Sequence, residues 1–259
     1  MKRRQFLRTL GTLLVLLPFR IFPFSQDKRT SFKYGVASGD PTNSNVILWT
    51  KLSGVESKKK KVRWEVSDQK SFSKIIAKGH VTAKLDDDFT VKVDAKIPEQ
   101  FNGQKIFYRF TVNKTYSEIG TTLTLPSYNP KGFNIAFCSC SNYPAGYFNS
   151  YNEIAENADI HLVLHLGDYL YEYAADGYAS SQAREMNRLV EPKHEIITLN
   201  DYRQRHATYR KDNDLKKLHA NKPMIAVWDI MSLLMTHGKM EQKIIKKMKE
   251  IFKIESKMQ

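Results

Sequence analysis

The feature that most constrains the fold is a change of hydrophobic period near the middle of the chain. Before residue 126, short runs of alternating apolar and polar residues are separated by turn residues. A period of two is typical of strands that bury one face. After residue 132, apolar runs alternate with segments of helical spacing. The pattern therefore predicts an antiparallel β region followed by an α/β region.

The first region, from Phe32 to about Leu125, predicts an antiparallel β-sandwich of the fibronectin or immunoglobulin type. In its clearest run, Val46, Leu48 and Thr50 should share the buried face. The expected strands are Asn45 to Lys51, Val62 to Ser67, Thr90 to Ala95, Ile106 to Val112 and Thr121 to Leu125.

Two further features of this region carry expectations. Trp49 and Trp64 are interpreted as core or inter-sheet residues. The lysine run from Lys58 to Lys61 stands between two strand-like runs and predicts a solvated hairpin loop, with a patch for an anionic partner as the alternative.

The second region follows a predicted linker at Pro126 to Pro130. Strand, helix and strand in succession predict a right-handed crossover in a mainly parallel sheet. The expected strands are Phe133 to Ser139, Ile160 to Leu166 and Met224 to Trp228, and the expected helices are Phe148 to Asn157, Leu199 to Arg210 and Asp214 to Ala220. Because parallel strands end at one edge of a sheet, Cys138, Cys140, Asp168 and Asp229 should lie along that edge.

Charge and cysteine content narrow the possible functions. The net charge of +14 is spread through most of the 259 residues, and no aromatic-interleaved basic motif of a nucleic-acid module is visible. The two cysteines, Cys138 and Cys140, are too few for a disulfide framework and lack the second pair of a zinc ribbon. Their spacing on one predicted strand should point both side chains the same way.

The first residues predict an export signal over residues 1–25. A basic segment from Lys2 to Arg8 precedes an apolar stretch from Leu10 to Leu17, which is shorter than the roughly 20 residues that cross a bilayer. Arg3 and Arg4, followed by Phe-Leu, resemble a twin-arginine signal. We therefore expect export through the twin-arginine translocase to the periplasm, the cell surface or the medium.

Asp168 is the best candidate metal ligand from the residues alone. It follows a glycine at a predicted strand end, where a carboxylate can reach a cation, and several such strand ends can hold two cations about 3.5–4 Å apart. Tyr171 could add a phenolate and Cys140 a thiolate. The alternatives are an ordinary Gly-Asp turn, an amphipathic core tyrosine and an inert buried cysteine.

Five motifs in order along the chain resemble the alkaline phosphatase D, or PhoD-like, family. They are Phe32 to Pro41, Val46 to Lys51, Cys138 to Phe148, His165 to Tyr173 and Asp201 to His206. The resemblance implies a β-sandwich at residues 32–126 and the start of a calcineurin-like metallophosphoesterase domain at residues 133–229. It also implies secretion and hydrolysis of phosphate mono- and diesters, and a phospholipase D-like or general phosphodiesterase preference is the alternative within this class.

The same resemblance implies a site with Fe³⁺ and Ca²⁺, in which a metal-bound hydroxide attacks a phosphate ester. Carboxylate and phenolate oxygens suit Fe³⁺, oxygen-rich sites suit Ca²⁺, and the cations would neutralise phosphate charge. The implied metal ligands are Cys140, Asp168, Asp229 and a tyrosine, either Tyr171 or Tyr202. Arg203 is implied as a catalytic contact on the phosphate side.

The resemblance breaks after Asp229. The tail at residues 230–259 holds five of the eight methionines of the chain. Read from the third base of the Ile230 codon, the permitted codons can spell His-Glu-Phe-Ala-Asn-Asp-Thr-Trp-Lys-Asn-Gly-Ala-Glu-Asn, which continues the family pattern. We therefore expect a lost nucleotide, an incomplete active-site domain and an inactive enzyme. The alternative is a real basic amphipathic helix from Lys239 to Phe252 that touches a membrane.

A hypothesis from another class is also open. In it, only the sandwich from Phe32 to Leu125 folds, and the exported chain serves as a non-enzymatic interaction module. Retention of iron and calcium by the purified chain would favour the enzyme, whereas a stable fragment that ends near Pro126 would favour the module.

Overall fold

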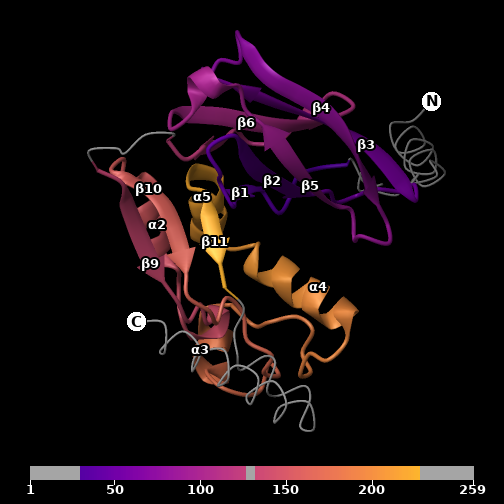
Figure 1. Cartoon of the computed structure of the whole chain (residues 1–259). Helices are drawn as coiled ribbons and strands as arrows, with labels where there is room; N and C mark the ends of the chain where they lie inside the picture. The colour runs from indigo at the N-terminus through magenta and orange to yellow at the C-terminus, as the bar shows by residue number, and fades with distance from the viewer. Residues whose placement is uncertain (1–29, 127–131, 228–259) are drawn as a thin grey trace, which may run out of the picture.

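The structure, a computed structural model, describes residues 30–126 and 132–227. Figure 1 shows a β-rich upper part, formed by the first range, above a lower part in which strands and helices mix. The predicted export signal, residues 127–130 of the predicted linker, Asp229 and the tail lie outside the described residues. No helix in the two described ranges is long and apolar enough to cross a membrane.

The elements follow the order in which the sequence changes period. The strands are β1 (Val36–Gly39), β2 (Asn45–Lys51), β3 (Lys59–Ser67), β4 (Ile75–Lys84), β5 (Thr90–Lys96), β6 (Lys105–Val112), β7 (Thr115–Tyr116), β8 (Gly120–Leu123), β9 (Asn134–Cys138), β10 (Ile160–His165) and β11 (Met224–Ala226). The helices are α2 (Asn149–Glu156), α3 (Ser180–Glu185), α4 (Leu199–Tyr209) and α5 (Asn213–Asn221), with short 3-10 helices at Glu99–Phe101 and Tyr143–Ala145.

The strands of the first region form two antiparallel groups around one core. β2 pairs with β1 and β5, while β3 pairs with β4 and β6, and β6 also pairs with β7 and β8. Burial alternates along β2 as its sequence predicts, with Val46, Leu48 and Thr50 inward. The inward residues meet in a cluster that includes Val36, Val46, Leu48, Val62, Val66, Ile106, Tyr108 and Phe110. Burial of this apolar surface is the main force that holds the two groups together.

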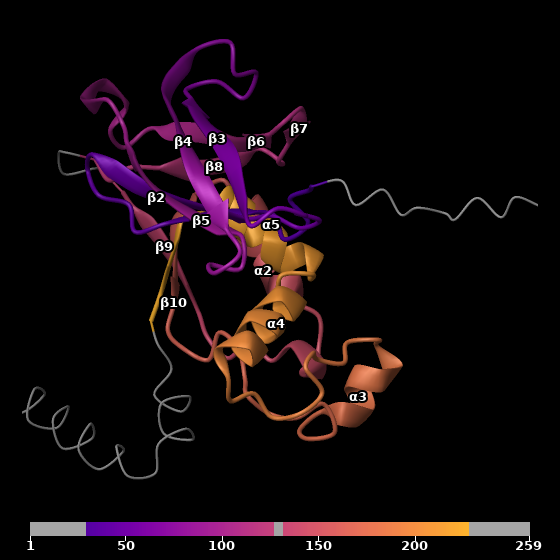
Figure 2. The ribbon, with the colours of Figure 1, turned by 90° about the vertical axis from the view of Figure 1, so that its right-hand side faces the viewer.

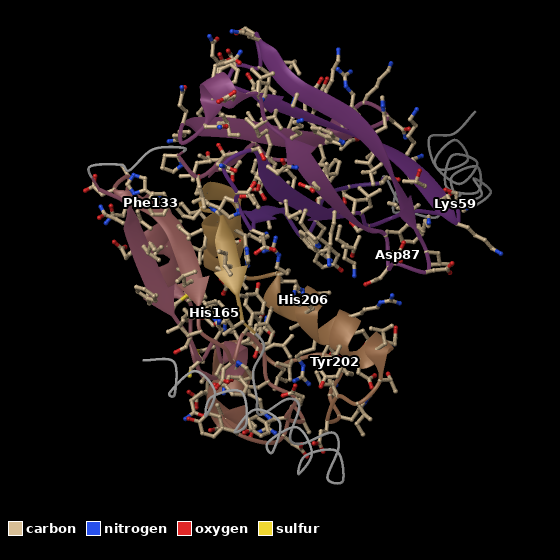
Figure 3. All side chains as sticks on the ribbon, viewed as in Figure 1. Lys59, Asp87, Phe133, His165, Tyr202 and His206 are labelled. Atoms are coloured by element: carbon tan, nitrogen blue, oxygen red, sulfur yellow. The ribbon has the colours of Figure 1, made fainter. Side chains whose placement is uncertain are left out.

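The lysine run does not form the predicted loop. Lys59, Lys60 and Lys61 begin β3 and pair with the last residues of β4. Figure 3 shows Lys59 at the same end of the sheet as Asp87. The prediction was wrong because β4, with its lysines and Gly79, carries a weak strand signal, and without it the partner of the lysine run cannot be seen.

The second region forms the predicted parallel sheet. β9 and β11 both pair in parallel with β10, and α2 makes the crossover between β9 and β10. The sequence did not indicate that this sheet continues into the first region, where β11 also pairs in parallel with β1 at Gly39 and Met224. A Cβ at Gly39 would lie 2.5 Å from the carbonyl oxygen of Met224, so this close approach requires glycine.

Helices cover one face of the parallel strands. α2 and α5 pack together, and their buried residues Tyr151, Leu215 and Leu218 share a core with Val163 of β10. Figure 2 shows α2, α4 and α5 on the same side of β9 and β10. β9 is not the buried strand that its apolar run predicts, since Phe137 is 62 % exposed. An apolar run does not reveal whether both faces of its strand are covered.

Candidate functional site

Backbone hydrogen bonds connect the turn that follows β9 to the turn that follows β10. The amide of Cys140 donates to the carbonyl of Gly167 over 3.3 Å, and the amide of Ser141 donates to the carbonyl of Asp168 over 2.8 Å. Gly167 has φ +114°, while Cys140 and Asp168 have φ +60° and +54°. Non-glycine residues are uncommon in the left-handed region and gather at functional sites. Cys140 and Asp168 are two of nine such non-glycine residues in the described ranges, and they are the two that lie at this edge.

Three side chains converge at this edge. The carboxylate oxygen Oδ2 of Asp168 accepts a hydrogen bond from the hydroxyl of Tyr171 over 2.8 Å. The Sγ atom of Cys140 lies 3.5 Å from the same oxygen. The structure therefore brings together three of the candidate ligands: a carboxylate, a phenol and a thiol.

The two cysteines differ, contrary to the expectation that they point the same way. β9 ends at Cys138, so the strand alternation does not extend to Cys140. Cys138 packs against the core that α2 and α5 share, and burial raises the pKa of its thiol to about 11. Cys140 is exposed and free. Of the two, Cys140 is the thiol that a ligand can reach.

The other candidates lie elsewhere. Tyr202 on α4 donates its hydroxyl to Oε1 of Glu172 over 3.1 Å, and Figure 3 shows it on the lower helix. Arg203 donates through Nη2 to the carbonyl of Asp86 over 2.6 Å, in the turn between β4 and β5. The partners of these two hydrogen bonds are Glu172 and Asp86, not Asp168. Their roles as ligand and phosphate contact stay predictions.

The chemistry of the donor set fits a hard cation such as Fe³⁺. Burial, the hydrogen bond to Asp168 and the proximity of Cys140 raise the pKa of Tyr171, so the free phenol keeps its proton at neutral pH. A multivalent cation between these groups would replace that proton. Within residues 30–126 and 132–227, no three His, Cys, Asp or Glu side chains form a metal-binding group, so the fit depends on the tyrosine as third donor.

His165 contacts Ser141, the residue after Cys140, and so helps to fix this edge of the sheet. This role was not predicted from the sequence. Its ring is fully buried, and Nε2 lies 2.8 Å from Oγ of Ser141 and 3.2 Å from the hydroxyl of Tyr151. Burial lowers the pKa of His165 to about 4, against a smaller opposing effect of Asp168. The imidazole is therefore neutral at pH 7 and fixes the residue next to Cys140. The only signal in the sequence was a histidine that ends an apolar strand.

Arg205 holds the backbone that carries Tyr171. The arginine is 1 % exposed and donates to three carbonyls, those of Glu191 over 3.3 Å, Pro192 over 3.1 Å and Tyr171. A planar guanidinium suits such divergent acceptors. The sequence places Arg205 in a motif but gives no sign of its partners, which lie in two loops.

Arg188 and Asp212 fix the loop that follows Cys140. Their side chains form a buried ion pair with 2.7 Å between Nη1 and Oδ2. The Arg188 guanidinium also donates to the carbonyl of Tyr143 and lies 3.9 Å above its ring. Asp212 caps α5 by accepting from the amide of Leu215 over 2.9 Å. One carboxylate thus serves both a helix start and the site loop.

Comparisons with protein families match both regions of the chain. The model described as PhoD-like phosphatase matches residues 135–229, and the model described as PhoD-like phosphatase, N-terminal domain, matches residues 21–126.

Individual proteins give the same result. Alkaline phosphatase D of Bacillus subtilis (strain 168) is 40 % identical over 207 residues, which cover 76 % of this chain and 34 % of that protein. The chain therefore spans about a third of the length of this relative. A solved structure of PhoD is 39 % identical with a TM-score of 0.69, over 76 % of this chain and 38 % of that one.

Proposed function

Because the chain belongs to the PhoD-like phosphatase family, we propose that it forms the amino-terminal part of a metal-dependent phosphoesterase. In this proposal, residues 32–126 are a β-sandwich and residues 133–229 begin the metallophosphoesterase domain. The shared core of the two antiparallel strand groups supports the first assignment, and the parallel order of β9, β10 and β11 supports the second. The substrate class is a phosphate ester.

The observation that carries this proposal is the convergence of Cys140, Asp168 and Tyr171 at one sheet edge. These residues would hold Fe³⁺, with Asp229 as a further ligand. The cation would supply positive charge that binds and polarises a phosphate ester. Ca²⁺ prefers six to eight oxygen ligands. Among the described residues, no three His, Cys, Asp or Glu side chains form a group that could hold a metal ion, and we assign Ca²⁺ no ligand here.

The chain's own residues have separate tasks in this site. Without a bound cation, Asp168 accepts a hydrogen bond from the hydroxyl of Tyr171 and so orients the phenol. Ser141, His165 and Arg205 fix the positions of the two loops. Arg203 would contact the phosphate only after its Nη2 leaves the carbonyl of Asp86.

We also propose that the protein is exported and that this chain turns over phosphate esters poorly. The paired arginines and the short apolar stretch at residues 1–25 support export. Among the described residues three donors converge, and even with Asp229 they are few for the two cations that metal-assisted phosphate hydrolysis commonly uses, which supports low activity.

Metal analysis together with an activity assay tests the proposal. The purified chain should retain stoichiometric iron, and Asp168→Asn should lose it because the central carboxylate is gone. Asp176→Asn, an exposed position in the same loop, is the matched control and should keep the metal. Hydrolysis of a bis-aryl phosphate should stay far below the roughly 1–10³ s⁻¹ of typical enzymes. Equal iron in both variants would overturn the site, and enzyme-like turnover would overturn the low activity.

A further inference from the structure

A hollow of about 330 Å³ lies between the strands β1, β2 and β11 and the helices α4 and α5. Six of its lining residues carry the chemistry: Trp49, Lys92, Tyr169, His206, Arg210 and His219. Figure 3 shows His206 at the end of α4 that faces the strands. None of Cys140, Asp168 and Tyr171 lines the hollow, so it is distinct from the candidate metal site.

Arg210 brings a buried positive charge to this hollow. It is 2 % exposed, and it donates to the carbonyls of Tyr34 over 3.2 Å and Val36 over 3.1 Å. Its guanidinium lies 4.8 Å from the ring of Trp49. No carboxylate in the described ranges forms an ion pair with it. A buried charge with only neutral partners is costly, and an anion in the hollow would offset that cost.

Two histidines, His206 and His219, also line the hollow. His219 is 9 % exposed and bonds the hydroxyl of Tyr169 through Nε2 over 2.7 Å. Its other ring nitrogen, Nδ1, is buried and has no hydrogen-bond partner within the described part of the chain. His206 stacks on Tyr169 with ring centroids 5.5 Å apart.

The charges around the histidines are positive. Burial first, and then the charge of Arg210, lowers the pKa of both His206 and His219. Lys92, an exposed residue of β5, adds a further positive charge to the lining. The positive charges in the lining therefore favour a negatively charged ligand.

We propose that the hollow binds a small phosphate-type oxyanion. Arg210 and Lys92 supply the charge, and Nδ1 of His219 supplies a neutral donor when the ring is protonated there. Nε and Nη2 of Arg210 already donate to the carbonyls of Tyr34 and Val36, so the guanidinium would act on a tetrahedral anion through its charge, with Lys92 and Nδ1 of His219 as donors. The volume is at the small end of the range for ligand pockets, which suits inorganic phosphate or a small phosphate monoester.

Calorimetric titration of the full chain, freed of metal by a chelator, tests this site. Inorganic phosphate should bind saturably with one site per chain, and Lys92→Gln should weaken binding by about tenfold because a charge-assisted contact is lost. Lys84→Gln, an exposed lysine on β4, is the matched control and should bind as the unaltered chain does. His206→Gln should also weaken binding. Asp168→Asn should not, because it alters only the metal edge.

Several results would overturn the proposal. They are the absence of saturation at millimolar phosphate, equal affinities of Lys92→Gln and Lys84→Gln, and loss of binding in Asp168→Asn. Circular dichroism of each variant shows whether it is folded. Lys92 and Lys84 are both exposed, so their comparison holds even if His206→Gln does not fold. A parallel titration with glycerol phosphate identifies the source, since tighter binding than inorganic phosphate assigns the site to an organic monoester.

Discussion

At the scale of single residues, one support of the candidate site is a buried, uncharged histidine. His165 has a folded pKa of about 4 against an ordinary value of 6.5, because its ring is fully buried. Between these two values the unfolded chain binds more protons than the folded chain. The stability is therefore complete above pH 6.5 and declines as the pH falls toward 4. For a fully buried group, the loss reaches about 3 kcal/mol.

Replacement of this histidine should flatten the pH dependence. We expect the free energy of unfolding of His165→Gln, measured by urea titration, to fall less between pH 6.5 and 4 than that of the unaltered chain. His80→Gln, on the exposed face of β4, is the control and should keep the full dependence. Identical slopes in all three proteins would contradict the assignment.

The sequence indicated the candidate site residues that follow strands but not the residues that support them. Cys140 and Asp168 could be predicted because the carboxyl ends of parallel strands meet at one edge. Tyr171 and Tyr202 could not be separated, since the choice depends on the path of the loop after Asp168. His165 and Arg205 were missed as supports because their partners are groups distant in the sequence, which no local pattern encodes.

At the scale of elements, α4 holds the loop that carries Tyr171 in place through hydrogen bonds. Thr198 and Asp201 form a capping box at its start, and backbone hydrogen bonds to Thr198 lower the pKa of Asp201 to about 2. From this helix, Arg205 holds three loop carbonyls. Asp201 of the family motif is thus a helix cap, and Arg205 positions the loop.

Loss of the guanidinium fork should loosen this loop. Arg205→Lys keeps the positive charge but loses the hydrogen bonds to three carbonyls. The amides of Ala175 and Ile196 form backbone hydrogen bonds between the two loops. In this variant they should exchange hydrogen about tenfold faster. Hydrogen exchange followed by mass spectrometry measures this. The amide of Asn157, at the end of α2, serves as an internal control and should keep its rate. Unchanged exchange at Ala175 and Ile196 would show that the loop does not need Arg205.

The elements themselves were predictable where the pattern was strong. β2, β5 and β6 alternate cleanly, and α5 begins at an aspartate cap. β4 was not predicted because it has few apolar residues. The exposure of β9 was not predicted because burial depends on which elements cover the sheet.

At the scale of the whole molecule, the two regions share one packed body. β1 joins β11 in a six-stranded sheet, and Ala220 of α5 belongs to the core of the first region. α5 also contacts β1 and β8 of the first region. Arg210 adds hydrogen bonds to carbonyls more than a hundred residues away. A sequence read in local windows could not predict this joint, because it depends on one glycine and on contacts between distant segments.

In the proposed function, Cys140, Asp168 and Tyr171 form a metal-binding edge. Titration of the metal-free chain with Fe³⁺, followed by visible absorption, tests it most directly because a phenolate ligand adds its own charge-transfer band, which a Tyr→Phe variant removes while any thiolate band of Cys140 remains. We predict that the band saturates at one equivalent, disappears in Tyr171→Phe and persists in Tyr202→Phe. A band that persists in Tyr171→Phe and disappears in Tyr202→Phe, or no band in the unaltered chain, would contradict the account.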